Sequence, residues 1–282
     1  MDIGVVIVTY LSEDTIERCI KSVQDEFPES KICIYDNASN DETIELIKRR
    51  FNNIKVIKSD ENVGFGRGVN RASSETNSDY LIVLNPDCFL TKGFSDGLKR
   101  AIAEHPGVSV YVPIIFDDDG KRVSPYCRRR FPSPTIIGLE TLGLSGRLRK
   151  IGEVKRYLML NKSIKKQYIE VCSGACFVIK KDVFDEIGGF DEDFFLLGED
   201  VELCFRLWKK GYKIILIPDI NAIHLKGVSR EKVPFLVERA GVISMGLLAK
   251  KMGMSLYSIF IRIIGYMKIT ISYCHRLISG RF

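Results

Sequence analysis

The 282-residue sequence has eight cysteines but no C-x-x-C pair, and most of the cysteines lie inside apolar segments. This pattern is typical of buried thiols in a reducing cytosol, and it argues against a disulfide framework or a zinc finger. Cys172 and Cys176 have a spacing that would put them on one face of a strand near His224, which leaves a metal site there as the minor alternative.

The sequence also lacks a long uncharged apolar run. Arg262 and Lys268 interrupt every window in the tail that approaches the roughly 18 residues that a membrane-spanning helix requires. No basic segment with a small-residue cleavage site precedes the apolar residues 3–8. We therefore expect a cytoplasmic protein without a spanning helix.

Two common nucleotide-binding fingerprints are missing. No P-loop is present, and the loop Asn62–Asn70 has three glycines whose spacing is not G-x-G-x-x-G. Because that loop does not follow the first strand, it does not indicate a dinucleotide fold. A permissive glycine backbone beside a nucleotide, with Arg67 near the phosphates, is still expected there.

The net charge of +6 is unevenly distributed. Residues 1–110 contain 13 basic and 18 acidic side chains, residues 111–170 contain 13 and 6, and residues 231–282 contain 8 and 2. An acidic-leaning first half with a basic tail favours an enzyme body with one basic docking surface over a general nucleic-acid coat.

The first hundred residues alternate between strand and helix signals, which predicts an α/β fold with a mostly parallel sheet. The continuous apolar run Ile3–Thr9 is typical of a strand buried on both faces. Ser12 is expected to cap the helix that follows. The other elements expected here are strands at 31–35, 54–57 and 80–84, and helices at 41–50 and after the glycine cluster 64–68.

The pattern changes after residue 108. Asp117–Gly120 predicts a hairpin turn between 108–116 and 121–124, and the basic, proline-containing segment 125–170 predicts a mobile excursion. A strand at 170–179, a helix at about 200–210 and a strand at 213–217 follow. The helix is expected to have one apolar face, formed by Val201, Cys204, Phe205 and Trp208. We divide the chain into a nucleotide-binding half (1–110), a catalytic half (111–230) and a C-terminal helical region (231–282).

Four polar clusters follow the strands, at the edge where ligands bind in such sheets. They are Thr9-Tyr10, the segment 36–41, Asn85-Pro86-Asp87, and His224 after the strand that ends at residue 217. Asp36 precedes the capping residue Asp41 by several positions, so it is free to accept the N3–H of a uracil or thymine ring. The neighbouring Asn37 could serve a carbonyl of that ring. Asp87 in Asn85-Pro86-Asp87 is presented by a rigid turn, and it suits Mg²⁺ or Mn²⁺ bound together with substrate phosphates.

An acid pair, Glu199 and Asp200, opens the helix at 200–210. Acids in a first turn usually interact with the helix dipole. Successive helical residues point about 100° apart, so the two carboxylates cannot both face one substrate. One is expected to be a base and the other structural.

Together these motifs resemble the family-2 inverting glycosyltransferases, and most closely their bacterial rhamnosyltransferase-like branch. The resemblance covers about residues 3–230. It is carried by Val6-Ile7-Val8-Thr9-Tyr10, Asp36-Asn37-x-Ser39-x-Asp41, Asn62-x-Gly64, Leu84-Asn85-Pro86-Asp87, Gly188-Gly189-Phe190-Asp191, Gly198-Glu199-Asp200-Val201-Glu202-Leu203 and His224-x-x-Gly227-x-Ser229.

The resemblance implies a GT-A, Rossmann-like fold and a single-displacement transfer from a nucleotide diphosphate sugar. It implies that Asp87 and His224 bind the metal and that Asp200 is the base, with Glu199 as its support. The nucleotide-binding positions that it implies are Thr9, Tyr10, Asp36, Asn37, Asn62, Gly64, Arg67 and Asn85. The general D-x-D metal motif is Asn85-Pro86-Asp87 here, which leaves a single carboxylate.

The implied reaction moves L-rhamnose from dTDP-rhamnose to a lipid-linked acceptor in surface polysaccharide synthesis such as that of O-antigen. UDP-hexoses, including UDP-galactofuranose, are alternative donors. Three other classes remain open. They are a nucleotidyltransferase, a catalytically silent relative, and a nucleic-acid-binding protein that uses residues 121–166. The first would need a glycine-rich loop after strand one, where this sequence has Thr9-Tyr10-Leu11-Ser12.

The tail predicts a basic amphipathic helix at 250–278 that docks on an anionic membrane from the cytoplasmic side. Projected on a helix, its five basic residues fall in one arc, and Ile261 is the one apolar residue that violates the pattern. The alternative is a helix packed on its own domain or against a second subunit. The basic residues of the arc are Lys250, Lys251, Arg262, Lys268 and Arg276.

Overall fold

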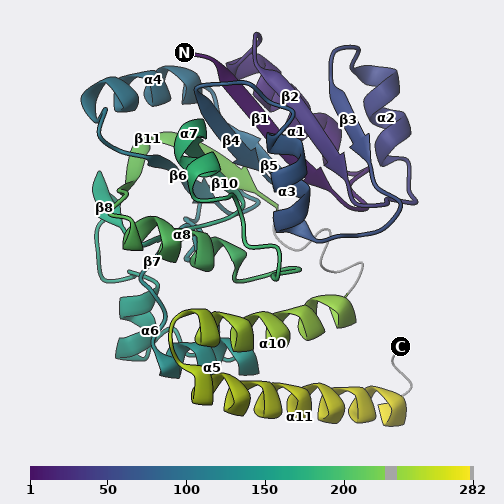
Figure 1. Cartoon of the computed structure of the whole chain (residues 1–282), viewed down its shortest axis with the longest axis vertical. Helices are drawn as coiled ribbons and strands as arrows, with labels where there is room; N and C mark the ends of the chain where they lie inside the picture. Colours follow the sequence, from purple (N-terminus) through teal and green to yellow (C-terminus); the bar gives the residue numbers. More distant parts are fainter. Residues whose placement is uncertain (226–233, 280–282) are drawn as a thin grey trace.

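The structure, a computed structural model, describes residues 1–225 and 234–279. A central sheet with helices on both faces forms the upper part of the molecule in Figure 1, and four helices (α5, α6, α10 and α11) form a layer beneath it. This confirms the predicted α/β architecture with a C-terminal helical appendage.

The first half of the chain alternates strands and helices closely as predicted. Its elements are β1 (Ile3–Thr9), α1 (Ile16–Glu26), β2 (Lys31–Asp36), α2 (Thr43–Arg50), β3 (Lys55–Lys58), α3 (Phe65–Ser73), β4 (Tyr80–Leu84), β5 (Cys88–Leu90) and α4 (Phe94–Glu104).

The second half is less regular. Its elements are β6 (Val110–Phe116), β7 (Arg128–Arg129), α5 (Pro134–Leu142), α6 (Gly152–Tyr157), β8 (Gln167–Ile169), β9 (Val171–Cys172), β10 (Cys176–Lys180), α7 (Lys181–Glu186), α8 (Glu199–Lys209), β11 (Ile214–His224), α10 (Pro234–Lys251) and α11 (Ser255–Ser279).

The large sheet is parallel in its first half and mixed in its second. Its order is β3-β2-β1-β4-β10-β6-β11-β5, with β8 also pairing with β11. β10 runs antiparallel to both β4 and β6, whereas β6 and β11 are parallel. The small sheet β7-β9 stands apart and connects the segment after β6 to the centre of the molecule.

Each face of β1 packs into a different core, because successive side chains of a strand point to opposite faces. Val5 and Ile7 contact the core covered by α1, α2 and α4, while Val6 and Val8 contact the core covered by α3, α7 and α8. The continuous apolar run of this strand is thereby explained.

Several local predictions require correction. Ser12 does not cap α1 with its side chain; its carbonyl accepts the amides of Thr15 and Ile16, and the helix begins at Ile16. In α8, Trp208 is 58% exposed, so it does not share the buried face of Val201 and Cys204. It stacks on Phe205 and meets Phe131 instead.

The segment predicted as one strand at 170–179 is broken. β9 ends at Cys172 and β10 starts at Cys176, because the backbone of 173–175 leaves the sheet to contact neighbouring loops. The strand predicted at 213–217 is longer, since β11 continues through an irregularity to His224. The predicted turn at Asp117–Gly120 is present, closed by the bridge between Phe116 and Val123.

The segment 125–170, in which the sequence shows little periodicity, has regular secondary structure. It contains two helices and two short strands, and Ile136 and Val154 form part of a small core of their own. Its helix α5 packs against α10 and α11. Short local periodicity could not reveal this order, because the packing partners lie more than a hundred residues away along the chain.

Candidate active site

A carboxylate and an imidazole meet where β4 and β11 end. The turn Asn85-Pro86-Asp87 joins β4 to β5, and β5 pairs antiparallel with the end of β11 so that Cys88 faces His224. His224 Nε2 lies 3.1 Å from Asp87 Oδ1, and both side chains are largely buried. The structure therefore brings together the two residues predicted to hold a metal ion. Gly227 and Ser229 of the same motif lie outside the described residues.

The ends of β1 and β2 form a second corner. Thr9 Oγ1 donates to Asp36 Oδ1 at 2.9 Å, and the amide of Ser39 donates to Asp36 Oδ2 at 3.0 Å. The sequence predicted that Asp36 is a free acceptor for a pyrimidine ring. This is wrong, because Thr9 and Asp36 are both fully buried. The carboxylate fixes the turn beside it instead.

Two non-glycine residues in this corner have left-handed backbone conformations. Leu11 has φ 53° after β1, and Ala38 has φ 59° after β2. The amide of Leu11 donates to Ser39 Oγ at 3.0 Å, which joins the two turns. Such conformations cluster at ligand sites. Tyr10 lies beside these turns and is half-buried, so it is open to a ligand.

The glycine loop is attached to this corner by asparagines. Asn37 Nδ2 donates to the carbonyl of Gly64, and Asn37 Oδ1 accepts the amide of Val63, both at 3.1 Å. Asn62 Oδ1 accepts the amide of Gly64 at 3.0 Å. Gly64 itself has φ 92°, and a side chain there would collide with the carbonyl of Phe195. Asn37 therefore uses both ends of its side-chain amide to shape the loop, and Asn62 uses its amide oxygen for the same purpose.

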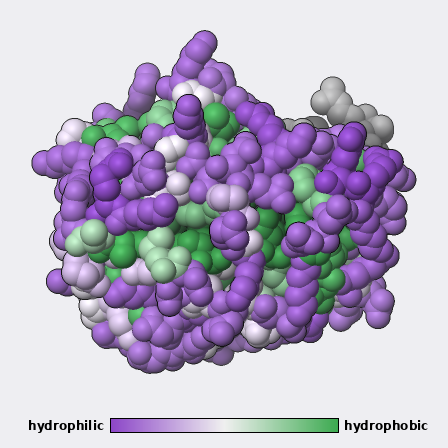
Figure 2. All heavy atoms as spheres, turned by 90° about the horizontal axis from the view of Figure 1, so that it is seen from above, coloured by the Kyte–Doolittle hydropathy of each residue, from purple (hydrophilic) through white to green (hydrophobic). Residues whose placement is uncertain are grey.

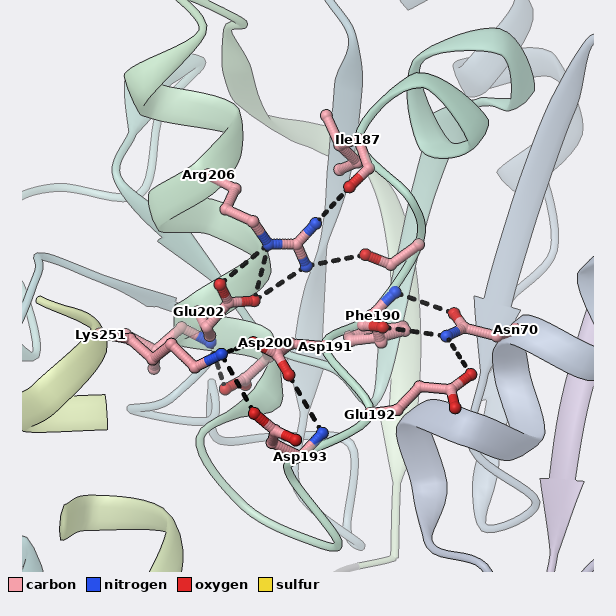
Figure 3. Close-up of polar contacts among 12 residues, drawn as sticks. Asn70, Ile187, Phe190, Asp191, Glu192, Asp193, Asp200, Glu202, Arg206 and Lys251 are labelled. Atoms are coloured by element: carbon pink, nitrogen blue, oxygen red, sulfur yellow. Dashed lines mark hydrogen bonds and ion pairs between the residues drawn. The ribbon is translucent and has the colours of Figure 1, made fainter. Parts of the chain in front are cut away.

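Arg67 faces a different partner from the one predicted. Its Nε donates to the carbonyl of Glu192 at 3.1 Å and lies 3.6 Å from a carboxylate oxygen of the same residue. Next to it, Asn70 exchanges hydrogen bonds with the backbone of Phe190 (Figure 3). Both residues of α3 thus hold the loop that precedes α8.

The residues just before that loop (187–189) are held from α8, and the loop itself (190–198) is held from α10. Arg206 pairs with Glu202 and donates to the carbonyls of Ile187 and Gly189 (Figure 3). Lys251 Nζ lies 2.6 Å from Asp191 and 3.2 Å from Asp193. The C-terminal helix α10 therefore contributes directly to the position of the loop that leads into the acid pair.

At the start of α8, the two acids have different surroundings. Asp200 Oδ2 accepts the amide of Gly174 at 3.2 Å, and Oδ1 accepts the amide of Val201 at 2.8 Å. Glu199 is buried. Asp200 is the acid that reaches the break between β9 and β10.

The break in the strand connects Asp200 to the corner formed by Asp87 and His224. The amide of Asn85 donates to the carbonyl of Ala175 at 2.9 Å, one residue after Gly174. The turn that contains Asp87 and the start of α8 that contains Asp200 are therefore hydrogen-bonded to adjacent residues of one short loop. The structure gathers Asn85, Asp87, His224 and Asp200 at one edge of the sheet.

Arg129 is a member of this group that sequence analysis missed. It comes from the basic excursion, and its Nη2 lies 2.5 Å from Asp200 Oδ2. Among the basic residues of 121–166, Arg128 and Arg129 are buried and bonded internally, so they form no nucleic-acid surface. No local signal in the sequence distinguishes Arg129 from its neighbours.

The fold and this site define a glycosyltransferase of the GT-A class. Solved structures share the fold: Staphylococcus aureus TarS 1-349 matches with a TM-score of 0.56 at 14% identity, over 89% of this chain and 71% of that one. GalNAc-T7 with UDP, GalNAc and Mn2+ matches with a TM-score of 0.59 at 18% identity, over 99% of this chain and 57% of that one.

Sequence comparison gives the family. The sequence model described as Glycosyl transferase family 2 matches residues 4–188, and the one described as Glycosyl transferase family group 2 matches residues 156–240. The chain belongs to glycosyl transferase family 2.

Similar curated proteins place it in the rhamnosyltransferase-like branch. It is 29% identical to the N-acetylglucosaminyl-diphospho-decaprenol L-rhamnosyltransferase of Mycobacterium tuberculosis, over 82% of this chain and 78% of that protein. It is 25% identical to the rhamnosyltransferase WbbL of Escherichia coli, over 78% of this chain and 82% of that protein. The chain is thus an enzyme of glycan biosynthesis, and the other enzyme and binding classes left open by the sequence are set aside.

Proposed function

We propose that the enzyme transfers L-rhamnose from dTDP-L-rhamnose to a hydroxyl group of a lipid-linked glycan, with inversion at the sugar carbon. The observation that carries this proposal is the position of Asp200, bonded to Gly174 on the loop that also holds the Asp87 turn. The sugar follows from the names of the mycobacterial and Escherichia coli relatives, and the lipid-linked acceptor follows from the name of the mycobacterial one. The dTDP group of the donor is what the resemblance of the sequence motifs implies.

Asp87 and His224 have the donor atoms that a divalent ion such as Mn²⁺ or Mg²⁺ accepts. Carboxylate oxygen suits both ions, and imidazole nitrogen favours Mn²⁺ of the two. Within residues 1–225 and 234–279, no group of three or more side chains could ligate a metal ion, so substrate phosphates would complete the set. When bound, the ion neutralises charge on the leaving diphosphate.

Asp200 serves as the general base. Its carboxylate takes the proton of the acceptor hydroxyl while the oxygen attacks the sugar carbon on the face opposite the leaving diphosphate. Inversion in one displacement needs one base and no covalent intermediate, so a single competent carboxylate is sufficient. Glu199, buried one position earlier on α8, supports the start of the helix.

The strained turns after β1 and β2 hold the pyrimidine ring. Because Asp36 is buried, it contributes to pyrimidine binding by fixing the turn that contains Ala38 and Ser39. Tyr10 and the backbone of Leu11 line the same corner and are half-buried. Asn62, Gly64 and Arg67 shape the loop on the diphosphate side.

We expect UDP and dTDP to bind at least about tenfold more tightly than ADP, a difference of about 1.4 kcal/mol. Asp36→Ala should reduce pyrimidine binding and also lower the Tm, since it leaves Thr9 and Ser39 without their acceptor. Isothermal calorimetry and thermal melts measure both effects, with the exposed Asp60→Ala as control. Equal binding of ADP and UDP would contradict the assignment.

A panel of nucleotide sugars tests the donor. With Mn²⁺ added, hydrolysis or transfer should be fastest with dTDP-L-rhamnose, and turnover of every donor should be low when the ion is left out. A clear preference for a UDP-hexose or for UDP-galactofuranose would leave the assignment as a glycosyltransferase intact and would contradict the proposed donor.

The outer surface of α11 carries an apolar face. Leu256 is 86% exposed, and seven further large apolar side chains of this helix are at least about half exposed; they are Ile259, Phe260, Ile263, Tyr266, Met267, Ile271 and Tyr273. The opposite side of the molecule, seen from above in Figure 2, is covered mainly by hydrophilic residues. Within the described residues, no helix is long and apolar enough to cross a bilayer.

The helix also has an inward face, which corrects the predicted division into one basic and one apolar side. Ile261, which violated the predicted pattern, is 1% exposed and packs against Ile137 and Ala249. Of the five basic residues predicted on one helix, Lys250 and Lys251 end α10, because the chain turns at 252–254 before α11 begins at Ser255. Lys251 and Lys268 pair with acidic residues of the protein. The side chain of Arg276 lies outside the described residues.

We propose that the apolar face of α11 docks the enzyme on the cytoplasmic surface of a membrane, where a lipid-linked acceptor is found. Lys250 is exposed. Lys268 of α11 donates a hydrogen bond to the carbonyl of Thr141, and the exposed residues Arg147, Arg149 and Lys150 follow Thr141 along the chain. These charges complement anionic lipids.

Ile259→Glu with Ile263→Glu should abolish cosedimentation with anionic vesicles, because burial of each such side chain contributes about 1.5–3 kcal/mol. Donor hydrolysis in solution should not change. Ile164→Glu, an exposed isoleucine outside α11, is the matched control. If the double variant still cosediments with vesicles, this face does not bind the membrane. A change in oligomeric state of the double variant would show instead that the face packs against a second subunit.

A further inference from the structure

The basic excursion places one buried arginine against the proposed base. Arg129 lies on β7, which pairs with β9 so that Arg129 faces Val171. Its Nη2 donates to the carbonyl of Cys172 at 2.8 Å and contacts Asp200 Oδ2 at 2.5 Å. β9 ends at Cys172, just before the break that contains Gly174. The Arg129 guanidinium and the amide of Gly174 therefore both donate to Asp200 Oδ2.

The guanidinium is enclosed by other groups of the excursion. Tyr126 lies with its ring 6.0 Å from the Arg129 guanidinium carbon, and the side chain of Tyr157 is buried beside it. Burial alone would lower the pKa of Arg129, but the charge of Asp200 and the neighbouring Tyr157 more than offset it, so the pKa is raised. Arg129 is therefore a permanent cation at this position.

A second carboxyl group lies near the arginine. Glu140 of α5 has a buried Oε1 with no hydrogen-bond partner among the described residues. Burial raises the pKa of Glu140, whereas a hydrogen bond from Ser145 and the charge of Arg129 act in the opposite direction. The cation thus lies within electrostatic reach of two carboxyl groups, Asp200 and Glu140.

We propose that Arg129 is a positioning residue for Asp200, and that the ordered excursion 125–160 exists in part to deliver it. With Gly174 on the same oxygen and Val201 on the other, Arg129 fixes the plane of the carboxylate that receives the acceptor proton. In the transfer step the acceptor O–H bond breaks, its proton moves to Asp200, and Arg129 neither gains nor loses a proton. The inference rests on the proposed function of Asp200.

A double-mutant cycle tests this role. Arg129→Met should lower kcat for transfer by about 10–100-fold, because a carboxylate released from its orientation loses the aligned geometry of the reaction. The dissociation constant of the nucleotide donor should change little. In the Asp200→Asn background, the same substitution should cost no more than about threefold, since two residues that act as one unit are not additive.

Arg128→Met is the matched control. Arg128 is equally buried and donates to the carbonyls of Lys162 and Ser163, but it does not contact Asp200. This variant should lower the Tm and leave kcat of the folded enzyme within about twofold. A purely structural role of β7 would give both arginine variants the same kinetic effect.

Two further variants keep the test informative if Arg129→Met does not fold. Arg129→Lys keeps the charge without the planar fork and should have an intermediate kcat. Arg129→Ala should regain part of its kcat on addition of millimolar guanidinium, and Arg128→Ala should not. Unchanged kcat in Arg129→Lys without rescue in Arg129→Ala, or additive effects in the cycle, would overturn the inference. Full turnover by Asp200→Asn would instead overturn the assignment of the base.

Discussion

Asp200→Asn lowers kcat for sugar transfer by about 10²-fold or more, the typical contribution of a positioned general base. The amide keeps the size of the carboxylate and can still accept hydrogen bonds from Gly174 and Arg129, so the site should remain assembled. It cannot take the acceptor proton. Binding of the nucleotide donor, measured by calorimetry, should be nearly unchanged, because the base does not contact the nucleotide corner.

Glu199→Gln provides the comparison for Asp200. Both acids open α8, but they point about 100° apart, and Asp200 is the one bonded to Gly174. Glu199→Gln should therefore retain most of the turnover of the wild type once its Tm has been checked. If Glu199→Gln abolishes transfer while Asp200→Asn retains it, the roles of the two acids are reversed.

Asp87→Ala lowers transfer by about 10²–10³-fold, and EDTA in excess has a similar effect on the wild type. The reason is the loss of several kcal/mol of charge stabilisation on the leaving diphosphate, with each 1.36 kcal/mol equal to a tenfold change in rate. Steady-state transfer assays with EDTA, followed by titration with Mn²⁺ and Mg²⁺, measure this dependence.

The control for Asp87 is Asp96→Ala on α4, an exposed carboxylate of the same type. It should have normal activity and normal recovery by Mn²⁺. Recovery of the wild type by metal and failure of Asp87→Ala to recover would locate the ion at the Asp87–His224 corner. Full activity of the wild type in EDTA would show that the reaction needs no divalent ion.

The parts of the fold that sequence predicted are those with strong local patterns. The apolar run of β1 and the apolar stripe of α1 are patterns in the local sequence, and they predict which side chains are buried. The stripe consists of Ile16, Cys19, Ile20 and Val23. The rule that ligands bind beyond strand ends also selected Asp87 and His224 correctly as neighbours. Both inferences need only the local chain and the direction of parallel strands.

The contacts of the site that sequence missed are made between distant segments. Arg129 lies 71 residues from Asp200 in sequence and meets it only because β7 pairs with β9. Asp36 was correctly located at the end of β2, but its burial depends on Thr9 and on the turn of Ser39. Neither can be read from residue type or spacing.

The tail shows the same limit. An amphipathic pattern with one apolar face was predicted, whereas α11 has an inner face around Ile261 and an outer face around Leu256 and Ile263. The inner face exists because α5 and α10 lie against it. Since Lys251 and Ser244 of α10 bond to the loop 190–198, the C-terminal region is packed into the catalytic domain in addition to carrying the face that we propose for membrane docking.

The most direct test of the central claim is transfer to a defined acceptor with analysis of the product. Purified enzyme is incubated with dTDP-L-rhamnose, Mn²⁺ and a short-chain N-acetylglucosaminyl diphospho-lipid, and the anomeric configuration of the product is determined by NMR. We predict one added rhamnose whose configuration is opposite to that of the donor, and no product with Asp200→Asn on the same time scale. A product with retained configuration, or no transfer from any pyrimidine nucleotide sugar to this acceptor class, would contradict the account.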